Sequence, residues 1–297
     1  MTTHLPIDHA FLRSSPLPSH ADADDKNARG SVLVVAGSSE VPGAALLAAT
    51  AALRAGAGKL QIAAVRSVAP YLAIAAPEAL VLALPETPDG EIDPACAPQL
   101  QDNASKARAV LVGPGMTDEE SAHRLVLALL ACSPETSFVL DAAAVTSFKD
   151  DKATLLTHKG RIAMTPHAGE MATFLGIDRD EVSANPVEAG QRAADSTGSV
   201  VAMKGTSTFV CDPDAGPWLC EGGGIGLATS GSGDVLAGIV AGLLARGATP
   251  LLATQWGVFL HAEAGRRLAR TVGKVGYLAR ELPGEIPAIL QEHSPAI

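Results

Sequence analysis

The sequence predicts an α/β fold in three layers, with helices covering both faces of a mostly parallel central sheet. Short runs rich in Val and Leu alternate with Ala-rich segments along the whole chain of 297 residues. The Val/Leu runs are continuously apolar rather than alternating, as is typical of strands buried on both faces. Hydrophobic residues make up 47% of the chain, enough for a large core.

Continuous apolar runs give the expected parallel strands, which are residues 31–36, 60–64, 80–84, 109–112, 138–141, 162–165 and 200–203. Two further runs, 208–211 and 218–220, flank the turn residues 212–216 and predict a β-hairpin. The segments between and after the strands are the expected helices, at about 44–55, 66–75, 95–106, 118–131, 142–148, 169–175, 186–197, 250–270 and 275–291, with one more beginning near Asp234.

The domain organisation follows from the same pattern. Residues 1–28 are polar and rich in proline, and we expect a partly ordered N-terminal lead-in there. Strand and helix segments then alternate without a linker or an internal repeat. We therefore expect residues 29–297 to form a single catalytic domain.

Composition excludes several classes of function. The net charge of −10 and the absence of a basic run argue against a nucleic-acid surface. No uncharged apolar run is long enough to span a membrane, and the first residues do not resemble a secretory signal. The cysteines show no CxxC spacing, which favours reduced thiols in a cytoplasmic protein over a metal cage or disulfides; they are Cys96, Cys132, Cys211 and Cys220.

The most informative stretch is ATSGSGDVLAG, residues 228–238, which opens an apolar helix. The small residues at Gly231, Ser232 and Gly233 let a ligand approach unpaired N–H groups at the positive end of the helix dipole. Asp234, in the first helical turn, would be placed to take a proton from a hydroxyl that attacks a phosphoryl group. The alternative is that these residues only cap the helix and complement its dipole.

Other loops at strand ends carry residues that are unusual for structure alone. Gly37–Gly43 and Gly113–Gly115 follow two buried strands, and a glycine run at 222–226 precedes the Asp234 motif. His167, after another strand, is a candidate substrate contact or a structural residue, and Glu170 is a second candidate contact or the first-turn acid of a helix. Lys204 follows the strand 200–203 and is succeeded by glycine and hydroxyl side chains, a combination that suits an anionic or nucleotide ligand. Because parallel strands end at one edge of the sheet, these loops together favour a nucleotide-using enzyme.

The order of these motifs resembles the ribokinase-like superfamily and, within it, the ADP- or ATP-dependent NAD(P)H-hydrate dehydratases. The resemblance runs from about residue 30 to 290. Its most specific pieces are TPHAGEM (165–171), KGTST (204–208) and ATSGSGDVLAG (228–238), supported by the stretch 34–58 and by VGPG (112–115). It implies a ribokinase-like three-layer fold and a repair reaction: the hydroxyl on C6 of hydrated NADH or NADPH is phosphorylated and phosphate is then eliminated.

The resemblance also implies roles for individual residues. Asp234 would be the base on the C6 hydroxyl, and the N–H groups of Gly231, Ser232 and Gly233 would hold the transferring phosphoryl group. Residues lining the hydrated dinucleotide would be Ala44, Gly115, His167 and Asp234. Residues contacting the adenine nucleotide would be Lys204, Gly205, Thr206, Ser207, Thr208 and Gly233.

The cofactors and partners are implied in the same way. ADP or ATP would be the co-substrate, with Mg²⁺ bridging its phosphates through few direct protein ligands. A homo-oligomer, a tetramer by resemblance, is expected, as is a separate NAD(P)H-hydrate epimerase in the same pathway.

The sequence departs from the family pattern in places. The second acid of a DADAL stretch is Ala143, an Asn-Pro pair is Gly224-Ile225, an aromatic residue of the first loop is replaced near Val41, and the Asp after a helical HxxAG is Arg266. Two alternatives stay open. One is a ribokinase-like kinase of a small alcohol or vitamin precursor; the other, suggested by Ala143 and Gly224-Ile225, is a nucleotide-binding homologue with impaired catalysis.

Overall fold

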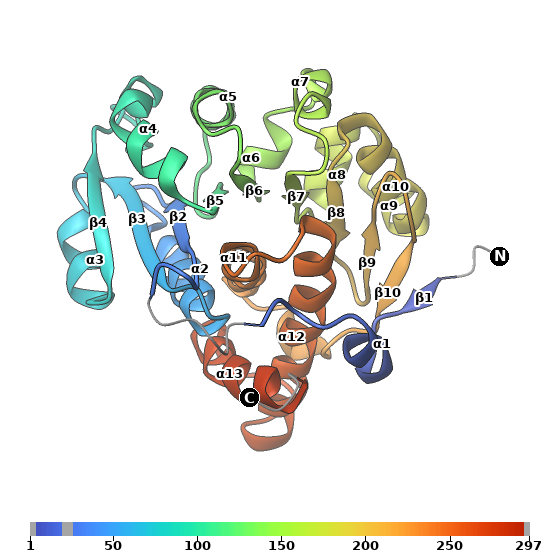
Figure 1. The fold of residues 1–297 in the computed structure, drawn as a ribbon. Coiled ribbons are helices and arrows are strands. Elements are labelled where there is room, and N and C mark those ends of the chain that lie inside the picture. Colours follow the sequence, from blue (N-terminus) through green and yellow to red (C-terminus); the bar gives the residue numbers. More distant parts are fainter. Residues whose placement is uncertain (1–3, 20–25, 294–297) are drawn as a thin grey trace.

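The computed structural model describes residues 4–19 and 26–293, and its centre is one ten-stranded sheet. The strand order is β1-β10-β9-β8-β7-β6-β5-β2-β3-β4 (Figure 1). From β8 across to β4 every neighbouring pair is parallel, while β9 is antiparallel to β8 and to β10. The sheet is therefore mostly parallel, and its long parallel part ends in a hairpin.

The strands are β1 (Leu5–Pro6), β2 (Ser31–Val35), β3 (Lys59–Val65), β4 (Ala79–Leu84), β5 (Ala109–Val112), β6 (Ser137–Leu140), β7 (Ile162–Met164), β8 (Val200–Met203), β9 (Thr208–Cys211) and β10 (Trp218–Cys220). The α-helices are α1 (His9–Ser14), α2 (Pro42–Arg54), α3 (Ala69–Ala75), α4 (Ala97–Lys106), α5 (Glu119–Cys132), α6 (Ala143–Thr146), α7 (Lys152–Leu156), α8 (Ala168–Leu175), α9 (Arg179–Ala184), α10 (Pro186–Thr197), α11 (Ser232–Ala245), α12 (Pro250–Thr271) and α13 (Leu282–His293). Short 3₁₀ turns are η1 (Pro94–Cys96), η2 (Ile225–Leu227) and η3 (Ala279–Glu281).

Helices cover both faces of the sheet, as the apolar runs predict. In β2, Val32 and Val34 pack with one hydrophobic cluster, while Leu33 and Val35 pack with the other. Helices α2, α11, α12 and α13 lie on the first face, and α4, α5, α8 and α10 lie on the second (Figure 1). The parallel strands are thus buried on both faces of the sheet, which is why their sequences do not alternate between apolar and polar residues.

Helix α11 is apolar on all sides and is almost wholly enclosed, as expected for a helix in the centre of a layer. Its glycines let it approach α2 very closely: an ideal Cβ on Gly238 would lie 2.2 Å from the carbonyl oxygen of Ala48, and one on Gly242 would lie 2.4 Å from that of Ala52. This packing fixes the axis of α11 and hence the place where its first turn meets the sheet edge.

The predicted lead-in contributes to the fold. Strand β1 pairs with β10, and Leu12 of α1 is fully buried in the core. The indole Nε1 of Trp256 donates a hydrogen bond to the carbonyl of Ser15, 2.8 Å away. Residues 20–25, the acidic end of the lead-in, lie outside the described residues. The division into a lead-in and one catalytic domain stays a prediction.

Several predicted helix boundaries were wrong. The helix expected at 142–148 is reduced to α6, and the one expected at 275–291 begins only at η3 and α13 because Gly276, with φ +96°, lies in the left-handed region. Sequence reasoning also missed β1, α1, α7 and α9, each of which has at most six residues.

Three cysteines are buried among apolar side chains, and burial raises the pKa of Cys96 to about 11 and those of Cys211 and Cys220 to about 12. Cys132 is partly exposed. None of the cysteines forms a disulfide, in line with the prediction of free thiols. Among the helices in residues 4–19 and 26–293, none has the length and apolarity needed to cross a bilayer.

Candidate functional site

The predicted site forms at the edge where the parallel strands end. Loops after β2, β5, β6, β7 and β8 all emerge there, and the first turn of α11 faces them. The chain turns in opposite directions after β2 and β5, because β3 and β4 lie to one side and β6 to β8 to the other. Ligands in parallel sheets bind at such switch points.

The N-terminus of α11, called the α11 mouth below, retains backbone N–H groups that are free to donate hydrogen bonds. Gly231 is the N-cap with φ +87°, and a Cβ there would lie 2.5 Å from Leu47 Cδ1, so a larger residue does not fit. In the described part of the chain, the N–H groups of Gly233 and Asp234 have no acceptor. The N–H of Ser232 instead donates to the carbonyl of Thr229 at 3.2 Å, so Ser232 is a weaker candidate for the anion hole than Gly233.

Ser232 is in hydrogen-bond contact with a buried histidine that sequence reasoning missed. The Nε2 atom of His261 lies 2.9 Å from Ser232 Oγ and 3.0 Å from the Ser232 carbonyl oxygen. Burial lowers the pKa of His261 to about 4, so the ring is neutral at neutral pH. A neutral ring supports the helix mouth without adding a charge to it.

Lys204 lies in the middle of the site. Its Nζ donates to Asp141 Oδ1 at 3.1 Å and is 3.9 Å from Glu170 Oε2. An ideal Cβ on Gly233 would lie 3.2 Å from the same Nζ, so the ammonium group borders the α11 mouth. Burial alone would lower the pKa of Lys204, but the two carboxylates outweigh burial and raise it. The side chain is therefore a fixed cation.

Two carboxylates contact Lys204: Asp141, which sequence reasoning did not assign to the site, and Glu170, which it left open as a substrate contact or a first-turn acid of a helix. Asp141 is 3% exposed and also accepts a hydrogen bond from Thr165 Oγ1 at 2.6 Å. Glu170 accepts from the backbone N–H of His167 at 2.8 Å. The available clue for Asp141 was its position directly after β6, as Lys204 lies directly after β8; Glu170 instead lies in the first turn of α8.

Asp234 is a poor acid in this setting. Its burial and the negative charge of Asp141 raise its pKa to about 7; Glu170 adds to the effect, while Lys204 opposes it. No hydrogen bond to its carboxylate occurs within the described ranges. A carboxylate with a pKa near neutrality and no competing partner is suited to general-base chemistry.

Ala44 and Gly115, two predicted substrate contacts, are neighbours at the switch point. An ideal Cβ on Gly115 would lie 2.7 Å from Ala44 Cβ, and Gly115 has φ +70°. The N–H of Gly37 donates to the carbonyl of Pro114 at 2.7 Å and joins the two loops.

His167 is the N-cap of α8, so its structural role is clear. Its Nδ1 accepts from the N–H groups of Gly169 and Glu170 at 3.0 and 3.1 Å. The opposite nitrogen, Nε2, is 3.4 Å from Glu170 Oε1, and 59% of the side chain is exposed. The capping bond orients the ring and leaves its outer edge accessible to a ligand.

The KGTST loop continues the site outwards from Lys204. Gly205 and Thr206 are exposed, Ser207 is half-buried, and Thr208 begins β9. An ideal Cβ on Gly222 would lie 1.9 Å from the carbonyl oxygen of Thr206, so the glycine run packs directly on this loop. The predicted nucleotide residues thus form one continuous surface beside the α11 mouth.

The carboxylates of the site do not form a metal-binding cage of their own, but they suit a Mg²⁺ ion that arrives bound to the nucleotide. Asp141, Glu170 and Asp234 supply hard oxygen donors, but Lys204 Nζ occupies the space between the first two. In the described residues no three His, Cys, Asp or Glu side chains are grouped to hold a metal. Water-mediated contact with a nucleotide-bound ion fits this donor set.

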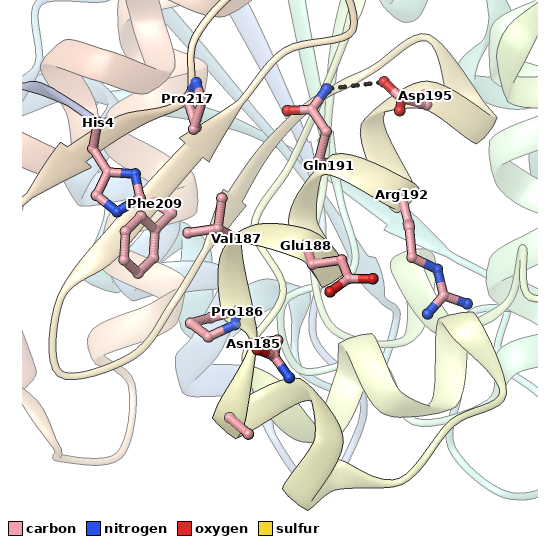
Figure 2. A pocket seen from close by; sticks show the side chains of 11 residues that line it. His4, Asn185, Pro186, Val187, Glu188, Gln191, Arg192, Asp195, Phe209 and Pro217 are labelled. Carbon is pink, nitrogen blue, oxygen red and sulfur yellow. Dashed lines mark hydrogen bonds between the residues drawn. The ribbon is translucent and has the colours of Figure 1, made fainter. Parts of the chain in front are cut away.

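A separate cavity of about 820 Å³ lies beside α10 and the β9–β10 hairpin, and no predicted site residue lines it. Figure 2 shows His4 and Phe209 in edge-to-face contact there, with Gln191 bonded to Asp195. Its walls lack the strand-end carboxylates and the helix mouth, so we place the functional site at Asp234.

A mostly parallel sheet covered by helices on both faces is also the fold of solved ribokinase-like proteins. A ribokinase-like superfamily protein from Enterococcus faecalis has this fold, with a TM-score of 0.83 at 24% identity over 98% of this chain and 96% of its own. The predicted fold class is confirmed.

The chain belongs to the NAD(P)H-hydrate dehydratase family, whose model matches residues 32–288. It is 48% identical to an ADP-dependent (S)-NAD(P)H-hydrate dehydratase of Xanthomonas campestris, over 95% of this chain and 94% of that protein. The corresponding Bacillus subtilis enzyme, co-crystallised with ATP and Mg²⁺, has a similar structure, with a TM-score of 0.81 and 26% identity over 99% of this chain and 100% of its own. A bifunctional NAD(P)H-hydrate repair enzyme of Moorella thermoacetica is 35% identical over 95% of this chain but only 53% of its own length. The resemblance inferred from the motifs is confirmed.

Proposed function

We propose that this chain catalyses the ADP-dependent dehydration of the S form of hydrated NADH and NADPH, with ATP as the alternative co-substrate, and is thus a lyase. The observation that carries the proposal is Asp234, an acid with a pKa of about 7 at the N-terminus of α11, beside unpaired N–H groups and the ammonium of Lys204. The relatives named above support the substrate and the nucleotide.

In the proposed reaction Asp234 removes the proton of the C6 hydroxyl, and the oxygen attacks the terminal phosphorus of the nucleotide. The P–O bond to the nucleotide breaks, so ADP leaves as AMP, or ATP as ADP. The N–H groups of Gly233 and Asp234 and the ammonium of Lys204 stabilise the negative charge on the transferring group. Nucleotide-bound Mg²⁺ would neutralise phosphate charge.

Phosphorylation makes a good leaving group. The lone pair of the ring nitrogen assists as the C6–O bond breaks and phosphate departs with the bonding electrons. Loss of a proton from C5 then restores the double bond of the reduced nicotinamide. Ala44, Gly115 and the outer edge of His167 would hold the dinucleotide, and Gly205 to Thr208 the nucleotide.

Partners follow from this reaction. The enzyme accepts one epimer, so we propose that an NAD(P)H-hydrate epimerase converts the other; the bifunctional relatives support a link between the two activities. A homo-oligomer remains a proposal, and sedimentation of the purified protein would test it.

The deciding experiment incubates the protein with hydrated NADH, Mg²⁺ and either ADP or ATP. The proposal requires recovery of NADH absorbance together with stoichiometric inorganic phosphate. A stable phosphoester would instead identify a kinase, and nucleotide binding without either product would identify an impaired homologue.

A further inference from the structure

Glu91 is a buried acid that the proposed reaction does not use. The residue lies in the loop between β4 and η1 and is 4% exposed. Its oxygen Oε1 accepts hydrogen bonds from the backbone N–H of Thr117 at 3.1 Å and from the Thr117 hydroxyl at 2.6 Å. Its other oxygen, Oε2, is buried and has no hydrogen-bond partner in residues 4–19 and 26–293. The chain therefore satisfies one oxygen of this carboxylate and leaves the other without a donor.

A structural role accounts for Oε1 alone. Thr117 precedes Asp118, the N-cap of α5, so the two bonds to Oε1 fix the start of that helix. The amide oxygen of a glutamine would accept the same two bonds without placing a charge in the interior. Burying a carboxylate oxygen costs free energy unless a donor or a cation compensates it, and Oε2 has neither in the part of the chain that the structure describes. The structural role leaves the acceptor Oε2 unexplained.

The loop that carries Glu91 reaches the two loops of the predicted dinucleotide pocket. At the tip of this loop the carbonyl of Gly90 accepts a hydrogen bond of 2.8 Å from the N–H of Ser39, in the loop after β2. Thr117, the partner of Oε1, lies two residues after Gly115, in the loop after β5. Glu91 therefore lies against the switch point between β2 and β5.

This part of the pocket lies near the site of the reaction. Ala44 contacts the position of Gly115, since an ideal Cβ there would lie 2.7 Å from Ala44 Cβ. Leu47 follows Ala44 by three residues, about one helical turn along α2, and lies 2.5 Å from an ideal Cβ on Gly231, the N-cap of α11. In the proposed reaction the C6 hydroxyl must reach Asp234 in the first turn of α11. The nicotinamide ring and its ribose are thus the parts of the dinucleotide nearest to Gly115.

The nicotinamide half carries donors that suit a carboxylate. Its carboxamide has two N–H groups, its ribose has hydroxyl groups, and all of them are uncharged. A phosphate would be repelled by Glu91, so the pyrophosphate and the 2′-phosphate of hydrated NADPH do not fit beside this residue. Hydrogen bonds to an ionised acceptor are about twice as strong as bonds between neutral groups.

We propose that Oε2 of Glu91 accepts a hydrogen bond from an uncharged donor of the nicotinamide half, either the carboxamide or a ribose hydroxyl. Because Oε2 is covered in this structure, the bond forms when the tip of the loop shifts. Pro88 and Asp89 at the tip are exposed, and the bond from Ser39 to Gly90 joins the tip to the loop after β2. The inference rests on the proposed function, because it takes the hydrated dinucleotide as the ligand.

The test compares Glu91→Gln with Glu86→Gln, which makes the same change at an exposed acid of the same loop. Glutamine at 91 keeps both bonds to Thr117 through its amide oxygen but replaces Oε2 by an N–H₂ group, which cannot accept a hydrogen bond. Hydrated NADH is titrated calorimetrically into each protein without nucleotide. Loss of a hydrogen bond to a charged acceptor should weaken binding by Glu91→Gln about tenfold or more, while Glu86→Gln should change it less than about twofold.

ADP affinity and thermal melts of the same variants should match wild type, which shows that the fold and the nucleotide site are intact. An affinity of Glu91→Gln for hydrated NADH equal to that of wild type overturns the proposal, because it is the result expected if Glu91 only fixes the start of α5.

An analogue of hydrated NADH in which a methyl ketone replaces the carboxamide distinguishes the two donors. If the carboxamide is the donor, wild type binds the analogue about tenfold more weakly than hydrated NADH, and Glu91→Gln causes no further loss. If a ribose hydroxyl is the donor, Glu91→Gln weakens binding of both compounds by the same factor. Failure of wild type to turn over hydrated NADH with ADP or ATP would contradict the proposed function, whereas the calorimetric comparison of the variants would stand.

Discussion

At the scale of single residues, Asp234 combines a cost in stability with a chemical advantage, and both come from its raised pKa.

 Its pKa of about 7 lies well above the ordinary aspartate value of 3.8, mainly because of burial and the nearby Asp141. The folded state therefore favours the protonated form. Stability is unaffected below the unfolded pKa, is lost as pH rises through the interval between the two values, and stays reduced above pH 7.

Asp234→Asn should lower kcat at least 100-fold, because the base is lost, and should leave nucleotide affinity within threefold. The same change should raise the free energy of unfolding at pH 8 by a few kcal/mol, since a shift of about three pKa units is worth roughly 4 kcal/mol at most. Turnover assays and urea melts check both. Near wild-type turnover would remove Asp234 from the mechanism.

The pH dependence of kcat/KM tests the same carboxylate without changing it. The reactive form is ionised, so kcat/KM should rise through an apparent pKa of about 7 and level off above it. His167→Asn is the control, because it removes an exposed imidazole while the acid limb should persist. A profile that is flat from pH 5 to 8 would contradict the assignment.

Lys204→Ala should raise the nucleotide KM about tenfold or more, because the ammonium beside Gly233 is lost, and Lys106→Ala, on an exposed side chain, should not. Initial rates at varied ADP concentration measure the effect. An unchanged nucleotide KM in Lys204→Ala would place Lys204 outside the nucleotide site.

At the scale of elements, the contact between α2 and α11 decides where the catalytic acid lies. Gly238→Ala would place a Cβ 2.2 Å from a backbone oxygen, so the helices must separate. We expect a loss of about 1–3 kcal/mol in unfolding free energy and a lower kcat, because the α11 mouth moves with its helix.

Gly284→Ala in α13 is the matched control, since nothing lies within 4 Å of its ideal Cβ. Helix propensity favours alanine there by up to about 1 kcal/mol, so stability should hold or rise. Thermal melts and initial rates of both variants make the comparison. Equal stability of the two variants would mean that the close approach of α2 and α11 does not determine the stability of the fold.

The elements also show what sequence could predict. Strands such as β2 were recognisable because both of their faces are buried and no polar alternation interrupts the sequence. In β2, Leu33 and Val35 belong to the hydrophobic cluster on one of these faces. Helices such as α7 and α9 were too short for a periodic pattern. The pairing of Lys204 with Asp141 joins residues that are 63 apart, and neither its geometry nor the resulting pKa of Asp234 is encoded in a local motif. The capping role of His167 likewise depends on which ring nitrogen faces the helix.

At the scale of the whole molecule, the N-terminal lead-in is part of the core. Leu12→Ala should lower the unfolding free energy by about 2–5 kcal/mol, because a fully buried side chain leaves a cavity between α1 and the helices of that face. Ile74→Ala, at a side chain that is 81% exposed, should change it by less than about 0.5 kcal/mol. Chemical denaturation measures both, and similar losses would show that α1 packs only loosely.

The three sequestered thiols have a practical consequence for work on this protein. A thiolate is the species that peroxide and alkylating reagents attack, and Cys96, Cys211 and Cys220 hardly ionise near neutral pH. Labelling of the native fold should therefore concentrate on Cys132 at the end of α5. A fluorophore placed there would report on the molecule without a single cysteine being engineered in or out.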